Sequence, residues 1–203
     1  MIRRCALAGV PFILGDDDVE TLLTSINRDE PIGKRDYAMI LLMLYYGIRG
    51  VQVRRMKLTD LLWQQSLIII QAAKYGTAVT QPLLPAVGNA ICDYIRCARS
   101  QSTDYQEVFL TCGGPLKPLA STGLTSMMIR RLGRAKVELP DYARKGTHLF
   151  RHRFASKMLD CGVLLEDIAD MLGHRDLNST MIYTKIDFKN LIDIAQEWPG
   201  VIL

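Results

Sequence analysis

Apolar residues recur at spacings of three and four through most of the chain, a pattern typical of amphipathic helices. Asp16 to Asp18 can cap a first helix, and Asp36 can cap a second, strongly apolar core helix that Gly47 would end. We also expect a short helix around Tyr183. The complete set of predicted helical segments is about 16–26, 37–46, 51–56, 87–99, 122–137, 148–159, 164–172, the turn around Tyr183, and 188–198.

The sequence pattern of β-strands is concentrated in residues 66–83. Residues 66–71 are rich in isoleucine, and residues 78–83 follow across Lys74-Tyr75-Gly76-Thr77, with Pro85 opening a new element. Two short apolar runs joined through a glycine-containing turn predict a β-hairpin. Without repeats or low-complexity tracts, the expected fold is mainly α with one small antiparallel β-sheet.

Composition is that of an ordinary globular domain, with 49% hydrophobic and 23% charged residues in 203. Lys and Arg number 25 against 21 for Asp and Glu, and the net charge of +4 allows a polyanionic partner without requiring one. Three clusters of basic residues are stronger evidence for a polyanionic partner than the net charge is. For each cluster alone, a solvated helix face is the more ordinary interpretation. The three clusters are Arg54, Arg55 and Lys57; Arg130, Arg131, Arg134 and Lys136; and Arg144, Lys145, Arg151 and Arg153.

Several classes of protein are disfavoured. The five cysteines are odd in number and lack C-x-x-C spacing, so we expect neither a disulfide framework nor a zinc site, and a reducing cytoplasm fits best. No apolar stretch approaches the roughly 20 residues that span a bilayer, so no membrane association is expected. Gly9 and Pro11 interrupt the N-terminal apolar run, and we interpret residues 1–15 as the remnant of a linker.

Candidate chemistry is concentrated in the C-terminal half. His148 and Arg151 lie three residues apart on a predicted helix and would therefore share a face, an arrangement suited to a phosphate. Alone, the pair could be incidental charge at a helix end. Leu172-Gly173-His174 follows at a predicted helix terminus, however, and Tyr183 lies nine residues after His174.

These motifs resemble the tyrosine recombinase, or phage integrase, family, whose C-terminal half reads H-x-L-R-H, then L-G-H, then a tyrosine in a short helix. Gly47-Ile48-Arg49 after an apolar helix resembles the family's first arginine motif, and Lys74 in the hairpin resembles its lysine loop. The resemblance implies a catalytic domain over residues 16–185, followed by a tail helix in 186–203 that docks on a neighbouring protomer. Packing of this helix against its own domain is the alternative. The catalytic residues it implies are Arg49, Lys74, His148, Arg151, His174 and Tyr183.

The resemblance also implies a mechanism. Tyr183 would attack a DNA phosphate and form a covalent 3′-phosphotyrosine bond, with His148 as acid or base, His174 donating to a phosphate oxygen, and Lys74 protonating the departing 5′ oxygen. The growing charge needs fixed cationic donors, and arginines supply these bidentately. Neither metal nor ATP is expected.

The chain departs from the family pattern at two positions within these motifs. Phe150 replaces the usual leucine, a change between core residues of little consequence, and Gln52 stands where an acidic residue is common. We expect the glutamine to alter the support of the first arginine.

The expected partner is double-stranded DNA, with four protomers in the complex that joins two sites. Contacts to the phosphate backbone orient a protein on DNA without reading its sequence. The residues predicted to make them are Arg54, Arg55, Arg130, Arg131, Arg134 and Lys136.

Other functions remain open from the sequence. Residues 164–183 could form a helix-turn-helix of a regulatory DNA-binding module, but Arg49 and Lys74 would then have no role. A type IB topoisomerase would use similar chemistry without joining two sites, and a catalytically silent regulatory relative is a further alternative.

Overall fold

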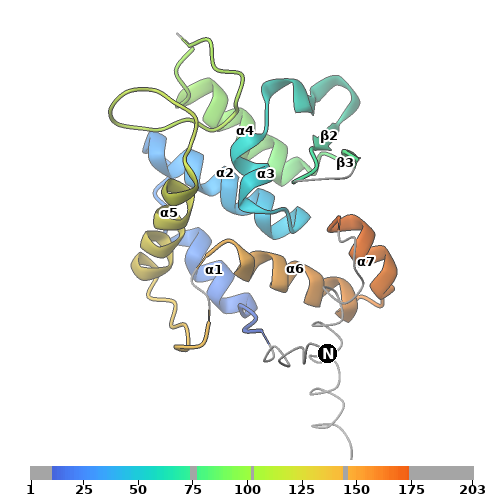
Figure 1. Cartoon of the computed structure of the whole chain (residues 1–203). Coiled ribbons are helices and arrows are strands. Elements are labelled where there is room, and N and C mark those ends of the chain that lie inside the picture. The colour runs from blue at the N-terminus through green and yellow to red at the C-terminus, as the bar shows by residue number, and fades with distance from the viewer. Residues whose placement is uncertain (1–10, 74–76, 102, 144–145, 174–203) are drawn as a thin grey trace, which may run out of the picture.

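The computed structural model describes residues 11–73, 77–101, 103–143 and 146–173 of the chain. It is mainly helical with one small sheet, as predicted (Figure 1). In chain order the helices and strands are α1 (Asp16–Thr24), α2 (Pro31–Tyr46), α3 (Gly50–Arg55), β1 (Leu61–Leu62), β2 (Leu67–Ile70), β3 (Val79–Pro82), α4 (Pro85–Cys97), α5 (Ser121–Arg134), α6 (His148–Asp160) and α7 (Leu165–Met171), with 3₁₀ turns η1 (Leu58–Asp60) and η2 (Trp63–Gln65) flanking β1.

Helix α2 is the central element of the core. It packs against α4 and α6, and Met39, Leu42 and Met43 on it are fully buried (Figure 1). Its predicted start at residue 37 was wrong, because the helix begins at Pro31. Proline is tolerated in the first turn of a helix, since the backbone N–H groups there have no hydrogen-bond partner within the helix. The predicted end of α2 was right.

Asp36 is therefore inside α2 and does not cap it. Its carboxylate is fully buried and accepts hydrogen bonds from Arg35 and from Arg131 of α5, with 2.8 Å between Arg131 Nε and Asp36 Oδ2. A buried carboxylate is tolerated when cations and hydrogen bonds compensate for lost hydration. The residue links two helices that are far apart in the sequence.

The sheet has strand order β1-β2-β3 and is antiparallel throughout. Ile68 pairs with Gln81 and Ile70 with Val79, which confirms the predicted pairing of the two hairpin strands. The two-residue strand β1 was not predicted, because it is too short to show alternation. Residues 74–76 of the predicted turn lie outside the described residues.

The predicted helices after the sheet are present as α4, α5, α6 and α7, each within a few residues of the expected bounds. Arg99, expected at the end of α4, lies beyond it and donates hydrogen bonds to the carbonyl oxygens of Tyr105 and Glu107. The predicted helices around Tyr183 and over 188–198 lie outside the described residues.

Helix α6 joins the main core to a smaller apolar cluster beneath α7. Leu149 and Phe150 on its first turn belong to the main core, whereas Phe154 packs with Ile168 and Leu172. On its outer side, Arg153 and Lys157 bind Asp16 at the start of α1. Within the part of the chain that the structure describes, no helix has the length and apolar character needed to cross a bilayer.

Candidate active site

The two predicted catalytic arginines meet in the structure. Arg49 follows the left-handed turn at Gly47 (φ 58°) and directly precedes α3, whereas Arg151 lies in the first turns of α6. Arg151 donates from Nη1 to the Gly47 carbonyl oxygen at 2.9 Å and from Nη2 to the Leu172 carbonyl oxygen at 2.7 Å. Packing of α6 against the end of α2 therefore brings together residues that the sequence separates by 102 positions (151 − 49).

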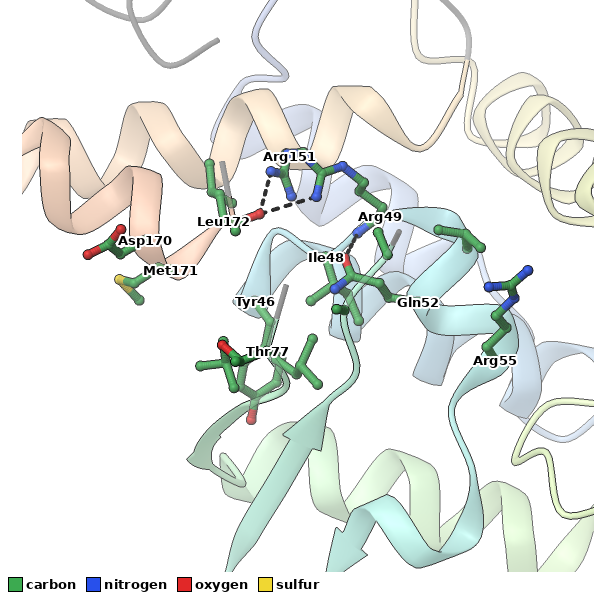
Figure 2. A pocket seen from close by; sticks show the side chains of 16 residues that line it. Tyr46, Ile48, Arg49, Gln52, Arg55, Thr77, Arg151, Asp170, Met171 and Leu172 are labelled. Carbon is green, nitrogen blue, oxygen red and sulfur yellow. Dashed lines mark hydrogen bonds between the residues drawn. The ribbon is translucent and has the colours of Figure 1, made fainter. Parts of the chain in front are cut away.

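A single oxygen lies between the two guanidinium groups. Arg49 Nη1 donates to the same Leu172 carbonyl, at 3.3 Å, as Arg151 does (Figure 2). That carbonyl is at the C-terminal end of α7, where the helix supplies no N–H partner and the helix dipole is negative. Two guanidinium groups thus each donate one hydrogen bond to the same acceptor oxygen.

A cleft of about 1360 Å³ opens beside this pair. Arg55 adds a third guanidinium to its wall, and Asp170 contributes a carboxylate (Figure 2). A polyanion entering this cleft would meet more positive than negative charge from these side chains. The full lining is Tyr46, Ile48, Arg49, Val51, Gln52, Arg55, Ile70, Ala72, Ala73, Thr77, Val79, Arg151, Asp170, Met171, Leu172 and Gly173.

The two histidines of α6 differ in environment. His148 is the first residue of the helix and is exposed, whereas His152 one turn later is partly buried, with 6.4 Å between the ring centroids. The pKa of His152 is lowered to about 4, first by burial and then by the charges of His148 and Arg151. His152 is therefore neutral near pH 7, while the exposed His148 is the one accessible to a ligand.

Gln52 supports the main chain of Arg49. Its Oε1 accepts a hydrogen bond from the Arg49 backbone N–H at 2.8 Å, as the N3 residue of a capping box does. At this position, where the family commonly has a carboxylate, a neutral amide thus supports Arg49.

The residues predicted to contact DNA differ in solvent exposure. Arg55, Arg130, Arg134 and Lys136 are exposed, as phosphate contacts require. Arg54 is partly buried and donates to the Leu119 carbonyl oxygen at 3.0 Å.

For Arg131 the prediction was wrong. Its side chain is only 2% exposed and is paired with Asp36, so it is a structural residue and cannot reach a phosphate outside the protein. The sequence showed four cationic residues within one helical segment but did not show which of them faces the core.

Sequence reasoning also missed some participants. The Leu172 carbonyl is a main-chain group, and its only signal was the Leu172-Gly173-His174 motif. Gln71, whose side-chain Nε2 donates to Asp60 Oδ1 at 2.8 Å, gave no motif. The predicted catalytic residues Lys74, His174 and Tyr183 lie outside the described residues.

The phage integrase family matches residues 13–190 of the chain. The putative integrase/recombinase y4rA of Sinorhizobium fredii is 40% identical over 201 residues, which cover 98% of this chain and 48% of the relative. The chain thus spans about half of that protein. The putative integrase/recombinase y4gC of the same organism is 35% identical over 192 residues, covering 94% of this chain and 97% of the relative.

A solved structure shares the fold. The XerH site-specific recombinase, determined bound to its palindromic difH substrate in a post-cleavage complex, superposes with a TM-score of 0.74 at 21% identity. The match covers 94% of this chain and 54% of XerH. At this identity the comparison establishes the arrangement of the helices and the sheet.

Proposed function

Because the chain belongs to the phage integrase family, we propose that it is a site-specific DNA recombinase that cuts and rejoins DNA through a covalent bond between Tyr183 and a 3′-phosphate. The observation that supports this most directly is the convergence of Arg49 and Arg151 on one oxygen atom. A phosphate oxygen carries more negative charge than a carbonyl oxygen and would bind both guanidinium groups more strongly.

In the proposed cleavage step the Tyr183 hydroxyl attacks phosphorus and loses its proton, and the bond from phosphorus to the 5′ oxygen breaks. Arg49 and Arg151 stabilise the charge that develops on the non-bridging oxygens. His148 is the base that accepts the Tyr183 proton, His174 donates to a phosphate oxygen, and Lys74 protonates the departing 5′ oxygen. A 5′ hydroxyl from the other strand then reverses these steps and reseals the DNA.

We propose double-stranded DNA as the partner, held over the cleft by exposed basic residues of α3 and α5. The predicted contacts that are exposed are Arg55, Arg130, Arg134 and, just beyond α5, Lys136. Exchange between two sites requires four active centres, and we therefore propose a tetramer on DNA. Each step uses side chains of the chain itself and calls for neither a metal ion nor ATP.

A helix-turn-helix regulator is less well supported. The family match extends over residues 13–190 and includes Arg49, which such a module would not use. Such a module would also give no role to Arg151, which is only 4% exposed. Burying a guanidinium costs free energy of desolvation that its interactions must offset.

The proposal is tested by trapping the covalent intermediate. The chain is incubated in EDTA, without nucleotide, with a pool of nicked duplexes of randomised sequence, whose short released strand diffuses away and prevents resealing. We expect a protein–DNA adduct that survives denaturing electrophoresis, and we expect Tyr183→Phe to abolish it. Tyr142→Phe is the matched control, because Tyr142 is 70% exposed and does not line the cleft.

An adduct that persists in Tyr183→Phe would overturn the assignment of the nucleophile. A wild-type adduct that forms only with added magnesium would overturn the metal-free mechanism.

A further inference from the structure

A line of side-chain hydrogen bonds runs from the Arg49 turn to the exit of strand β2. Gln52 accepts from the Arg49 N–H and donates from Nε2 to the Gln71 carbonyl oxygen, each at 2.8 Å. Gln71 Nε2 donates to Asp60 Oδ1 at 2.8 Å, and Asp60 Oδ2 accepts from the Lys57 N–H at 2.8 Å. Asp60 is 4% exposed, so the far end of this line is fixed in the protein interior.

The bonding requires an amide at residue 52. A glutamine side chain accepts through its oxygen and donates through its nitrogen, whereas an ionised glutamate can only accept. A carboxylate could keep the bond from the Arg49 N–H, but its second oxygen would face the Gln71 carbonyl oxygen without a proton between them. Gln52 can therefore hold two main-chain segments at once, and a glutamate can hold one.

The two segments belong to different parts of the proposed reaction. Arg49 is one of the two cations at the shared oxygen, and Gln71 follows β2 directly and precedes Lys74 by three residues. We propose that Gln52 is a positioning residue that sets the strand leading to Lys74 against the Arg49 turn, so that the leaving-group donor and the phosphate-binding arginine keep one spacing. This inference rests on the proposed function and deepens it.

The proposal has a specific chemical consequence. Protonation of the 5′ oxygen depends on the placement of a donor within hydrogen-bond reach, and general acids contribute about 10²- to 10⁴-fold to such steps. Loss of the Gln52–Gln71 bond should therefore slow expulsion of an oxygen leaving group. A sulfur leaving group is stable as a thiolate and needs no proton, so its expulsion should be insensitive to this bond.

The first experiment measures the free protein and needs no activity. Hydrogen exchange is compared for wild type, Gln52→Glu and the control Gln65→Glu, since Gln65 is an exposed residue of η2 with the same change of charge. We expect faster exchange over residues 66–83 in Gln52→Glu, continued protection of the Arg49 amide, and no change in Gln65→Glu. Equal exchange over 66–83 in all three proteins would overturn the proposal.

The second experiment measures cleavage of paired nicked substrates that carry oxygen or sulfur at the 5′ bridging position. For Gln52→Glu and the neutral Gln52→Met, we expect the ratio of oxygen to sulfur cleavage rates to fall about tenfold or more relative to wild type. Any effect of the new charge on phosphate binding cancels in this ratio, since both substrates share it.

An unchanged ratio, with both substrates slowed equally, would show that Gln52 acts through Arg49 alone and would overturn the coupling. If the wild-type chain forms no adduct with either substrate, the proposed function fails, and the exchange experiment still decides whether Gln52 holds the strand.

Discussion

Two nitrogen atoms of the Arg151 guanidinium serve two different carbonyl oxygens, those of Gly47 and Leu172. A lysine ammonium is a single point and cannot reproduce this fork. We therefore expect Arg151→Lys, and likewise Arg49→Lys, to lose about 10²-fold or more in the rate of adduct formation although the charge is kept. The measurement is single-turnover cleavage of the nicked substrate.

Arg55→Lys is the matched control for these variants. Arg55 also lines the cleft but is exposed, so its expected role is a simple phosphate contact that lysine can supply. Cleavage at a normal rate by Arg49→Lys or Arg151→Lys would show that positive charge alone suffices at that position.

His152 makes a prediction about stability and pH. Its folded pKa of about 4 lies below the ordinary histidine pKa of 6.5, so between these values the unfolded chain binds a proton that the folded chain rejects. Above pH 6.5 both states leave His152 neutral, and the free energy of unfolding is at its full value. As the pH falls from 6.5 toward 4, the unfolded chain is protonated first, and the free energy of unfolding decreases. Allowing for partial exposure, we expect a decrease of about 1 kcal/mol in the free energy of unfolding from pH 7 to pH 5.

Denaturant unfolding of wild type and His152→Gln at both pH values measures this effect. The change between the two pH values should be smaller in His152→Gln, whatever its stability at pH 7. Identical pH dependence in the two proteins would contradict the assigned shift.

At the scale of elements, the junction between α2 and α3 places the site. Gly47 adopts φ 58°, and an added Cβ would lie 2.6 Å from Phe154 Cδ1 of α6 and 2.8 Å from Leu172 Cδ2. Gly47→Ala combines left-handed strain of about 1 kcal/mol with overpacking of about 1–3 kcal/mol. We expect the free energy of unfolding to fall by about 2–4 kcal/mol, together with loss of cleavage as Arg151 is displaced.

Gly162→Ala separates these two contributions. Gly162 follows α6 with φ +77°, but an added Cβ there would meet nothing within 4 Å. It should show the backbone strain alone, about 1 kcal/mol, with cleavage retained. Equal destabilisation by the two variants in urea unfolding would mean that contact with α6 is unimportant.

At the scale of the whole molecule, we propose that the tail, residues 186–203, docks on a neighbouring protomer in the proposed assembly. Its apolar residues, which lie outside the described part of the chain, repeat at helical spacing and need a surface to cover them. We expect deletion of residues 186–203 to weaken synapsis and strand exchange more than cleavage of a single site. Paired gel assays of the two steps test this, with circular dichroism to verify folding.

Normal synapsis by the truncated chain would contradict docking on a neighbour. An unfolded truncated chain would instead assign the tail to its own core.

Local patterns were sufficient for the fold class and for most elements, because periodicity and turn residues act over a few positions. The hairpin, the left-handed end of α2 at Gly47 and the helix carrying His148 and Arg151 are examples. The start of α2 was misplaced because Asp36 has the chemistry of a cap as well as of a buried ion pair, and nothing within a few residues distinguishes the two roles.

The sequence on its own thus specified most of the described elements through short-range spacing, and the order of motifs that resemble the family indicated the two arginines of the site. Three-dimensional packing was needed to show that Arg49 and Arg151 share the Leu172 carbonyl, that Arg131 faces Asp36 rather than DNA, and that Gln52 spans two segments. Each of these contacts joins residues separated by 19 to 123 positions. Their formation depends on how helices and strands dock, which local periodicity does not encode.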